Sequence, residues 1–171
     1  MKKILYAASE ALPFASSGGL GDVIGSLPGA LAALEEPQYD VRVVLPLYGS
    51  IFDTYRKEMQ FLCHFDVPLS WRRQYAGIFE YQYNGVIFYF IDNEYYFKRG
   101  SLYGDFDDAE RFAFYSRAVL EMLPQIGFQP DIIHAHDWQS ALTVIYLKTK
   151  YKDNPFFTGI KAGFTIHNIA F

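Results

Sequence analysis

The sequence KILYAASEALPFASSGGLGDVIG, residues 3–25, decides the fold. Residues 3–8 form a short continuous apolar run, which is typical of a parallel strand buried on both faces. A glycine-rich turn follows at residues 16–22, and apolar residues from Val23 to Leu34 then recur at helical spacing. The turn matches neither the Gly-x-Gly-x-x-Gly pattern of dinucleotide sites nor a P-loop, so it predicts either a backbone cradle for a phosphate or a simple tight connection.

The rest of the chain repeats this alternation of strand and helix. Residues 61–92 differ, because they are rich in Phe, Tyr, Val and Ile and contain Asn84-Gly85, the favoured pair for a type I′ hairpin turn. We therefore expect an α/β fold with a doubly wound, Rossmann-like parallel sheet and an inserted antiparallel β-hairpin region. The further predicted strands are 39–45, 131–136 and 162–166, and the further predicted helices run from 107 or 108 to 124–127 and over 141–151.

Composition narrows the class of protein. The 171 residues are 51% hydrophobic, as expected for one globular domain or most of one. The net charge of -4 disfavours a nucleic-acid partner, and no apolar run reaches the roughly 20 residues of a membrane span. The single cysteine, Cys63, cannot form an internal disulfide. We expect a cytoplasmic protein with no nucleic-acid or membrane partner.

Polar residues follow three of the predicted strands, where open α/β sheets bind ligands. His134 and His136 share one face of their strand, and a zinc hydrolase using them with Asp137 is one hypothesis. Such a site needs more ligands, and His64 and His167 stand at no metal-ligand spacing. Hydrogen-bonded core histidines are the simpler interpretation.

Several blocks together resemble one family, the bacterial glycogen synthases and plant starch synthases. The resemblance covers essentially the whole chain and matches the amino-terminal part of these enzymes. The blocks are SEALPFASSGGLGDV (9–23), RVVLPLY (42–48), YGD (103–105) with ERF (110–112), HAHDWQ (134–139) and FTIHNIA (164–170).

The resemblance implies the GT-B fold, in which two Rossmann-like lobes face each other across a cleft. Residues 1–171 would be an incomplete amino-terminal lobe, and the carboxyl-terminal nucleotide-sugar lobe would be absent. The complete enzyme would transfer glucose from ADP-glucose to the non-reducing end of an α-1,4-glucan with retention of configuration. It would need no metal or other cofactor, and we expect the isolated chain to be inactive.

The resemblance also implies the site residues. Asp22, Asp137 and His167 would be catalytic and lie near the transferred sugar. Ser16 stands where the family usually has a lysine, so a cation facing the leaving phosphate is missing. The residues expected to bind substrate are Ser16, Gly18 and Gly19 at the donor diphosphate, Tyr103 at the sugar or acceptor, Trp138 and Gln139 at the acceptor, and Asn168. A glucan-binding module built on the aromatic loop 95–105 is a further alternative.

Overall fold

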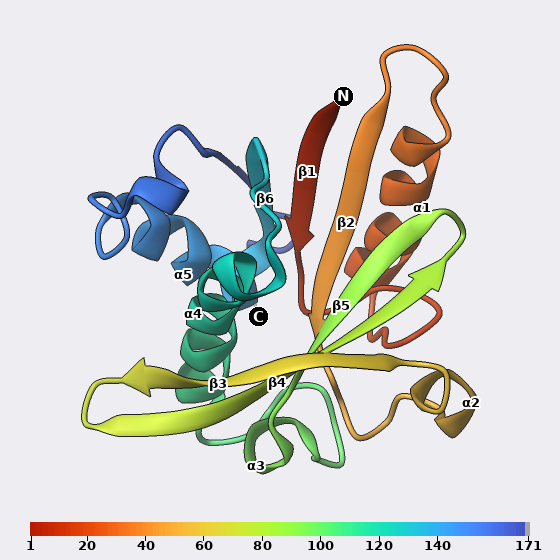
Figure 1. The fold of residues 1–171 in the computed structure, drawn as a ribbon. Coiled ribbons are helices and arrows are strands. Elements are labelled where there is room, and N and C mark those ends of the chain that lie inside the picture. The colour runs from red at the N-terminus through yellow and green to blue at the C-terminus, as the bar shows by residue number, and fades with distance from the viewer. Residues whose placement is uncertain (170–171) are drawn as a thin grey trace.

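The computed structural model describes residues 1–169, which form a seven-stranded sheet with helices on both sides (Figure 1). The elements in chain order are β1 (Lys2–Ala7), α1 (Gly19–Ala32), β2 (Tyr39–Pro46), α2 (Asp53–Arg56), β3 (Gln60–Leu69), β4 (Arg72–Tyr83), β5 (Val86–Asp92), α3 (Glu94–Phe97), α4 (Asp108–Ile126), β6 (Ile132–His136), α5 (Asp137–Lys148), the 3₁₀ helix η1 (Pro155–Phe157) and β7 (Lys161–Thr165). None of the helices in this part of the chain is long and apolar enough to cross a membrane.

The strand order is β3-β4-β5-β2-β1-β6-β7, and the last five strands of this order are mutually parallel. From β1 the chain first moves outward through β2, and it later returns past β1 to β6 and β7. Because such crossovers are right-handed, α1 covers one face of the sheet and α4 with α5 covers the other (Figure 1). The order reverses between β1 and β6, and the carboxyl ends of these strands are where such sheets bind ligands.

The structure confirms the predicted apolar face of α4. Phe112, Tyr115, Val119, Met122 and Leu123 are all buried. The helix ends at Ile126 and is capped by Gly127, whose φ of 67° is a left-handed conformation that glycine adopts without strain.

One side chain of α4 fixes the helix to the carboxyl edge of the sheet. The Tyr115 hydroxyl lies 2.7 Å from both the Ala8 and the Val44 carbonyl oxygens. Ala8 directly follows β1 and Val44 lies two residues before the end of β2, so the helix is held near the carboxyl edge of the sheet.

The region 61–92 is only partly an antiparallel insertion. Asn84 and Gly85 have φ values of 48° and 75°, which confirms the predicted type I′ turn between β4 and β5. However, β5 also pairs in parallel with β2, so it belongs to the central sheet. Its continuous apolar sequence VIFYFI (86–91) has the pattern of a buried parallel strand, and only β3 and β4 form the protruding hairpin (Figure 1).

The helix predicted at 141–151 was placed too late in the sequence. It begins at Asp137, directly after β6, and ends at Lys148. The Ser140 hydroxyl accepts from the His136 backbone N–H and donates to the His136 carbonyl, which closes the first turn. Asp137 and the residues after it are therefore a helix start and not a loop.

Candidate functional site

Two loops lie beside the point where the strand order reverses. One connects β1 to α1, and the other is the segment after β7, which contacts the start of α5. Each loop is held by one buried carboxylate that accepts hydrogen bonds from backbone N–H groups. The two carboxylates are Glu10 and Asp137.

Glu10 organises the glycine-rich turn. Its side chain accepts from the Ser17 N–H at 2.6 Å, the Ser17 hydroxyl at 2.7 Å, the Gly18 N–H at 3.3 Å and the Tyr103 hydroxyl at 2.6 Å. The residue is only 4% exposed, so these four donors replace water around a buried charge. The sequence prediction did not include Glu10, although an acidic residue directly after a buried strand was the available signal.

The glycines of this turn have different structural roles. Gly18 and Gly19 are exposed, and a Cβ atom at either position would meet nothing within 4 Å. A Cβ at Gly21 would lie 2.3 Å from the Ser16 Oγ, so this glycine is required by the packing of the turn against α1. The first two glycines thus leave the start of α1 open, where free N–H groups and the helix dipole favour an anion.

Tyr103 connects the turn to the rest of the site. Its hydroxyl donates to Glu10 and accepts from the Ser9 hydroxyl at 2.7 Å. Burial and the hydrogen bond to Glu10 raise the pKa of Tyr103 well above its ordinary value, so the phenol stays protonated.

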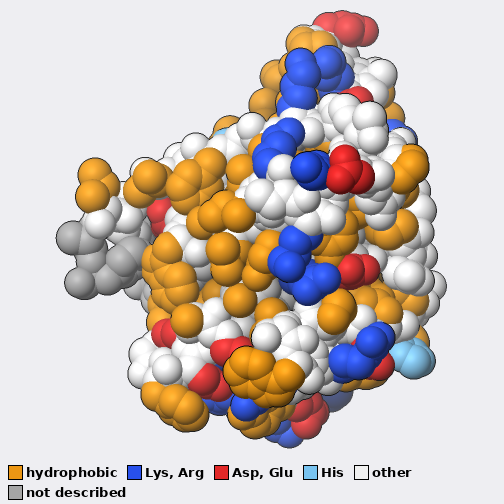
Figure 2. Space-filling model, turned by 90° about the vertical axis from the view of Figure 1, so that its left-hand side faces the viewer, with side chains coloured by type: hydrophobic (Ala, Val, Ile, Leu, Met, Phe, Trp, Pro, Cys, Tyr) orange, Lys and Arg blue, Asp and Glu red, His pale blue; other side chains and the backbone are white. Residues whose placement is uncertain are grey.

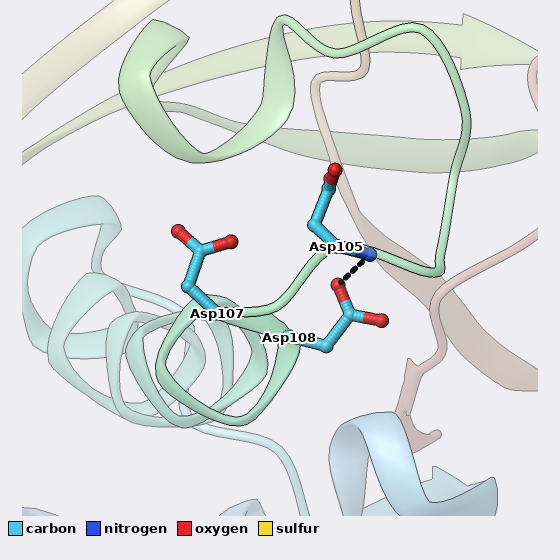
Figure 3. Close-up of side chains that lie close together, drawn as sticks. All are labelled: Asp105, Asp107 and Asp108. Carbon is cyan, nitrogen blue, oxygen red and sulfur yellow. Dashed lines mark hydrogen bonds between the residues drawn. The ribbon is translucent and has the colours of Figure 1, made fainter.

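Three aspartates lie close together where the Tyr103 loop enters α4 (Figure 3). Within residues 1–169, Asp105, Asp107 and Asp108 are the only cluster of carboxylate, imidazole or thiol groups close enough to hold a metal ion. Arg99 and Arg111 already pair with them at distances from 2.7 to 3.4 Å. The hydrogen bonds from Arg99 lower the pKa of Asp107. We interpret the cluster as a structural anchor.

The anchor fixes the loop that carries Tyr103. Arg111 is fully buried and donates to the Tyr96 carbonyl at 2.7 Å and to the Leu102 carbonyl at 3.1 Å. Asp108 accepts from the Gly104 N–H at 2.8 Å. The backbone is thus held on both sides of Tyr103. Much of the aromatic loop 95–105 is core, since Tyr96 and Phe97 are fully buried.

Asp137 stands at the junction of β6 and α5. Its φ of 58° is uncommon for a residue other than glycine, and such strained positions concentrate at functional sites. The residue is 2% exposed, and its Oδ1 accepts from the His167 N–H at 2.6 Å and the Asn168 N–H at 3.4 Å. No described residue donates to its Oδ2, so this oxygen keeps unused acceptor capacity.

A cavity of ≈ 660 Å³ lies beside this junction. Four of the predicted substrate-binding residues line it, which are Tyr103, Trp138, Gln139 and Asn168. Phe164 and Ile166 add apolar surface. Figure 2 views the side that lies at the left of Figure 1, and it shows hydrophobic side chains over much of this face with charged side chains in small groups.

The remaining predicted site residues lie on the α1 side of the edge. Ser16, Gly18, Gly19 and Asp22 are exposed and do not line this cavity. Among residues 1–169, no hydrogen bond or ion pair joins Asp22 to Asp137 or His167. The Tyr103 hydroxyl, which bonds to Glu10 and Ser9, links the two groups.

The histidines confirm the shared face but do not form a metal-ligand set. The rings of His134 and His136 are 4.2 Å apart. His134 Nε2 bonds to the Thr165 hydroxyl at 2.7 Å, and His136 Nδ1 bonds to His167 Nε2 at 2.9 Å. Burial, followed by the neighbouring histidines, lowers the pKa of His136 to about 3, so the ring is neutral. These bonds occupy one nitrogen of each of the three rings, and the three histidines are not among the groups close enough to hold a metal ion within residues 1–169.

A doubly wound sheet with polar loops at the carboxyl ends of its strands defines a Rossmann-like ligand-binding domain. A solved structure, the catalytic domain of starch synthase IV from Arabidopsis thaliana bound to ADP and acarbose, matches 98% of this chain with a TM-score of 0.82 and 32% identity. The match covers 34% of that chain and identifies the fold as that of a GT-B glycosyltransferase.

The particular family follows from the sequence. The sequence model of the starch synthase catalytic domain family matches residues 3–171, so the chain belongs to this family. A glycogen synthase from Desulforamulus reducens is 54% identical over 99% of the chain, and one from Geobacillus stearothermophilus is 51% identical over 99%. The chain spans 35% and 34% of the lengths of these two relatives.

Proposed function

We propose that this chain is the amino-terminal, acceptor-side lobe of a glycogen or starch synthase. The complete enzyme transfers glucose from ADP-glucose to the non-reducing end of an α-1,4-glucan and retains the anomeric configuration. The observation that carries the proposal is the pairing of Glu10 with Tyr103, because it joins an anion-binding turn to a cavity lined by aromatic rings. The family membership and the ADP and acarbose bound to the Arabidopsis relative support the same assignment.

The donor diphosphate is assigned to the open start of α1. Gly18 and Gly19 leave the backbone accessible there, and the helix N-terminus favours negative charge. Ser16 is exposed beside this turn and offers a hydroxyl in place of the family lysine. The cation that neutralises the leaving diphosphate must then come from elsewhere in the complete enzyme.

The acceptor glucan is assigned to the cavity beside α5. Tyr103 and Trp138 supply aromatic surface for sugar rings, and Gln139 and Asn168 supply amide groups for hydroxyls. The Gln139 Oε1 is buried and has no hydrogen-bond partner among residues 1–169, so it suits a sugar hydroxyl.

The transferred glucose lies between these two sites. An oxocarbenium-like transition state is stabilised by nearby carboxylates, a role that we assign to the free Oδ2 of Asp137 and to Asp22. His167, held by its backbone N–H against Asp137, contacts the same sugar. A second lobe closes the site from the opposite side. We place the protein in the cytoplasm, which its lone cysteine supports.

The test uses an extended enzyme, in which this chain replaces the matching segment of the Desulforamulus reducens glycogen synthase. We expect transfer of labelled glucose from ADP-glucose to glycogen by the extended enzyme and none by the chain alone. NMR of the freshly transferred linkage should show the α-anomer. A folded extended enzyme that binds ADP-glucose but elongates no glucan, while the relative itself is active in the same assay, contradicts the proposal.

A further inference from the structure

The buried ring of His136 is hydrogen-bonded to the ring of His167. His136 lies at the end of β6 and is 1% exposed, whereas His167 is exposed in the segment after β7. The two rings are nearly parallel, with centroids 5.2 Å apart, and His136 Nδ1 lies 2.9 Å from His167 Nε2. Within residues 1–169, this is the only hydrogen bond of the His167 side chain.

A single proton lies between the two nitrogens. A neutral imidazole carries one N–H, and the surroundings of His136 keep it neutral. If the proton of His136 were on Nε2, this buried N–H would have no acceptor among residues 1–169. Buried N–H groups without an acceptor are rarer than buried acceptors without a donor. The proton therefore belongs on Nδ1.

We propose that His136 is a positioning residue whose Nδ1–H donates to His167 Nε2 and thereby holds His167 as the Nδ1–H tautomer. His167 then presents a fixed N–H donor on the side of its ring that faces away from His136. This inference rests on the proposed function in one respect, which is that the oxygen receiving this hydrogen bond belongs to the transferred sugar. The tautomer itself follows from the contacts within this chain.

The backbone around the pair supports a fixed geometry. The His136 N–H and carbonyl are both bonded to the Ser140 hydroxyl, at 2.8 and 2.6 Å. The His167 N–H is bonded to Asp137 at 2.6 Å. With both main chains held, one bond between the rings sets the orientation of the exposed imidazole.

The direct test is the ¹⁵N spectrum of the histidine side chains in this chain. We expect a protonated Nδ1 and an unprotonated Nε2 in both His136 and His167. The reverse pattern in the two rings overturns the proposal whether or not the extended enzyme is active. If both rings show the expected pattern, with Nδ1 protonated and Nε2 unprotonated, but the extended enzyme is inactive, only the proposed function is contradicted.

Substitutions separate positioning from folding. Asparagine at 136 keeps an N–H donor near the position of Nδ1, so His136→Asn should preserve the His167 tautomer, whereas His136→Leu should abolish it. His134→Asn is the matched control, because His134 bonds to Thr165 and not to His167. In the extended enzyme, we expect His136→Leu to lower kcat about tenfold, the effect of one neutral hydrogen bond, with KM for glucan unchanged.

His136→Asn should restore most of this loss in kcat. If His136→Leu does not fold, the asparagine variant and the unmodified spectrum still decide the question. An unchanged His167 tautomer in a folded His136→Leu variant refutes the positioning role.

Discussion

The loops after β1 and β7 are each held by a buried carboxylate, but the two carboxylates differ in how many of their oxygens the protein itself uses. Glu10 uses both carboxylate oxygens on groups of the protein itself, and its four donors leave it no free capacity at the site. Asp137 uses only Oδ1 for the segment after β7 and keeps Oδ2 free of described donors. The fully bonded carboxylate is committed to holding its loop, whereas the half-bonded one, in a strained backbone, keeps an unused acceptor that our proposal assigns to the chemistry.

The largest effect should come from removing the charge of Asp137. Asparagine tolerates the left-handed backbone and can still accept from the His167 N–H, so Asp137→Asn should fold normally. In the extended enzyme, kcat should fall about 10²- to 10³-fold, as for loss of one electrostatic contact to a transition state.

The matched control for Asp137 is Asp131→Asn. Asp131 also accepts a backbone N–H, from Lys3 at 2.8 Å, but at the opposite end of the sheet. Its kcat should stay near that of the unmodified enzyme. Activity of Asp137→Asn within twofold of the unmodified enzyme would remove Asp137 from the chemistry.

Acid should lower the free energy of unfolding of the chain, because His136 is buried as a neutral ring. The pKa of His136 is about 3 in the folded chain and 6.5 ordinarily, so between these values the unfolded chain binds more protons. The free energy of unfolding therefore falls as the pH drops below 6.5, by at most about 1.4 kcal/mol for each unit, and this histidine adds no pH dependence well above pH 6.5. The titratable groups beside the His136 ring are Tyr6, His134 and His167. The pKa of His134 is also lowered.

The measurement is the free energy of unfolding by urea from pH 7 to pH 4, for the unmodified chain and for His136→Asn. The variant lacks the titrating ring, so the difference in stability between the two proteins should shrink or reverse as the pH falls. A difference that is constant with pH would show that His136 titrates normally.

Glu10→Gln should affect stability more than chemistry. Glutamine has one acceptor oxygen, and its NH₂ group would face donors that now bond to the second carboxylate oxygen. We expect the free energy of unfolding to fall by about 1–3 kcal/mol, and kcat/KM of the extended enzyme to fall roughly tenfold.

The control for Glu10 is Glu121→Gln. Glu121 accepts from the Tyr151 hydroxyl at 2.5 Å, away from the site, so it tests the same carboxylate–tyrosine bond without the loop. A Glu10→Gln variant that loses 10²-fold in kcat at unchanged stability would place Glu10 with Asp137 in the chemistry.

Local patterns made the alternating elements predictable. The apolar run at 3–8, the helical spacing on α4 and the Asn84-Gly85 turn all depend on neighbours in sequence, and the structure confirms each of them. The parallel pairing of β5 with β2 was not predictable in this way, because its apolar run suits either neighbour and its partner lies about 45 residues away.

The site was predictable only in part. The rule that ligands bind at the carboxyl ends of parallel strands points to the edge of the sheet where the cavity lies, and the motif residues Tyr103, Trp138, Gln139 and Asn168 do line this cavity. The role of Glu10 depends on Tyr103, which is far away in sequence. The early start of α5 depends on a left-handed aspartate, which no helix propensity favours.

A smaller effect is expected within α1. Gly21→Ala would place a methyl group 2.3 Å from the Ser16 Oγ, so we expect a loss of about 1 kcal/mol in the free energy of unfolding. Gly29→Ala in the same helix meets only the Asn84 carbonyl oxygen at 3.9 Å and should instead stabilise the chain by about 0.5–1 kcal/mol. Equal effects at both positions, measured by urea unfolding, would show that the turn does not pack against the helix.

The smallest effect concerns the missing cation on the α1 side. Ser16 is exposed and close to the start of α1, so Ser16→Lys places a positive charge near a helix end that already favours anions. The charge should cost about 0.3–1 kcal/mol of stability, because the helix dipole repels it.

The same charge should lower the KM for ADP-glucose severalfold in the extended enzyme, and added salt should weaken the gain since the site is exposed. Ser16→Gln is the control of similar length without charge and should leave the KM unchanged. A lysine variant that loses stability but gains no donor affinity would mean that another cation already neutralises the diphosphate, which would make the α1 side a structural scaffold and leave the chemistry to the side of Asp137.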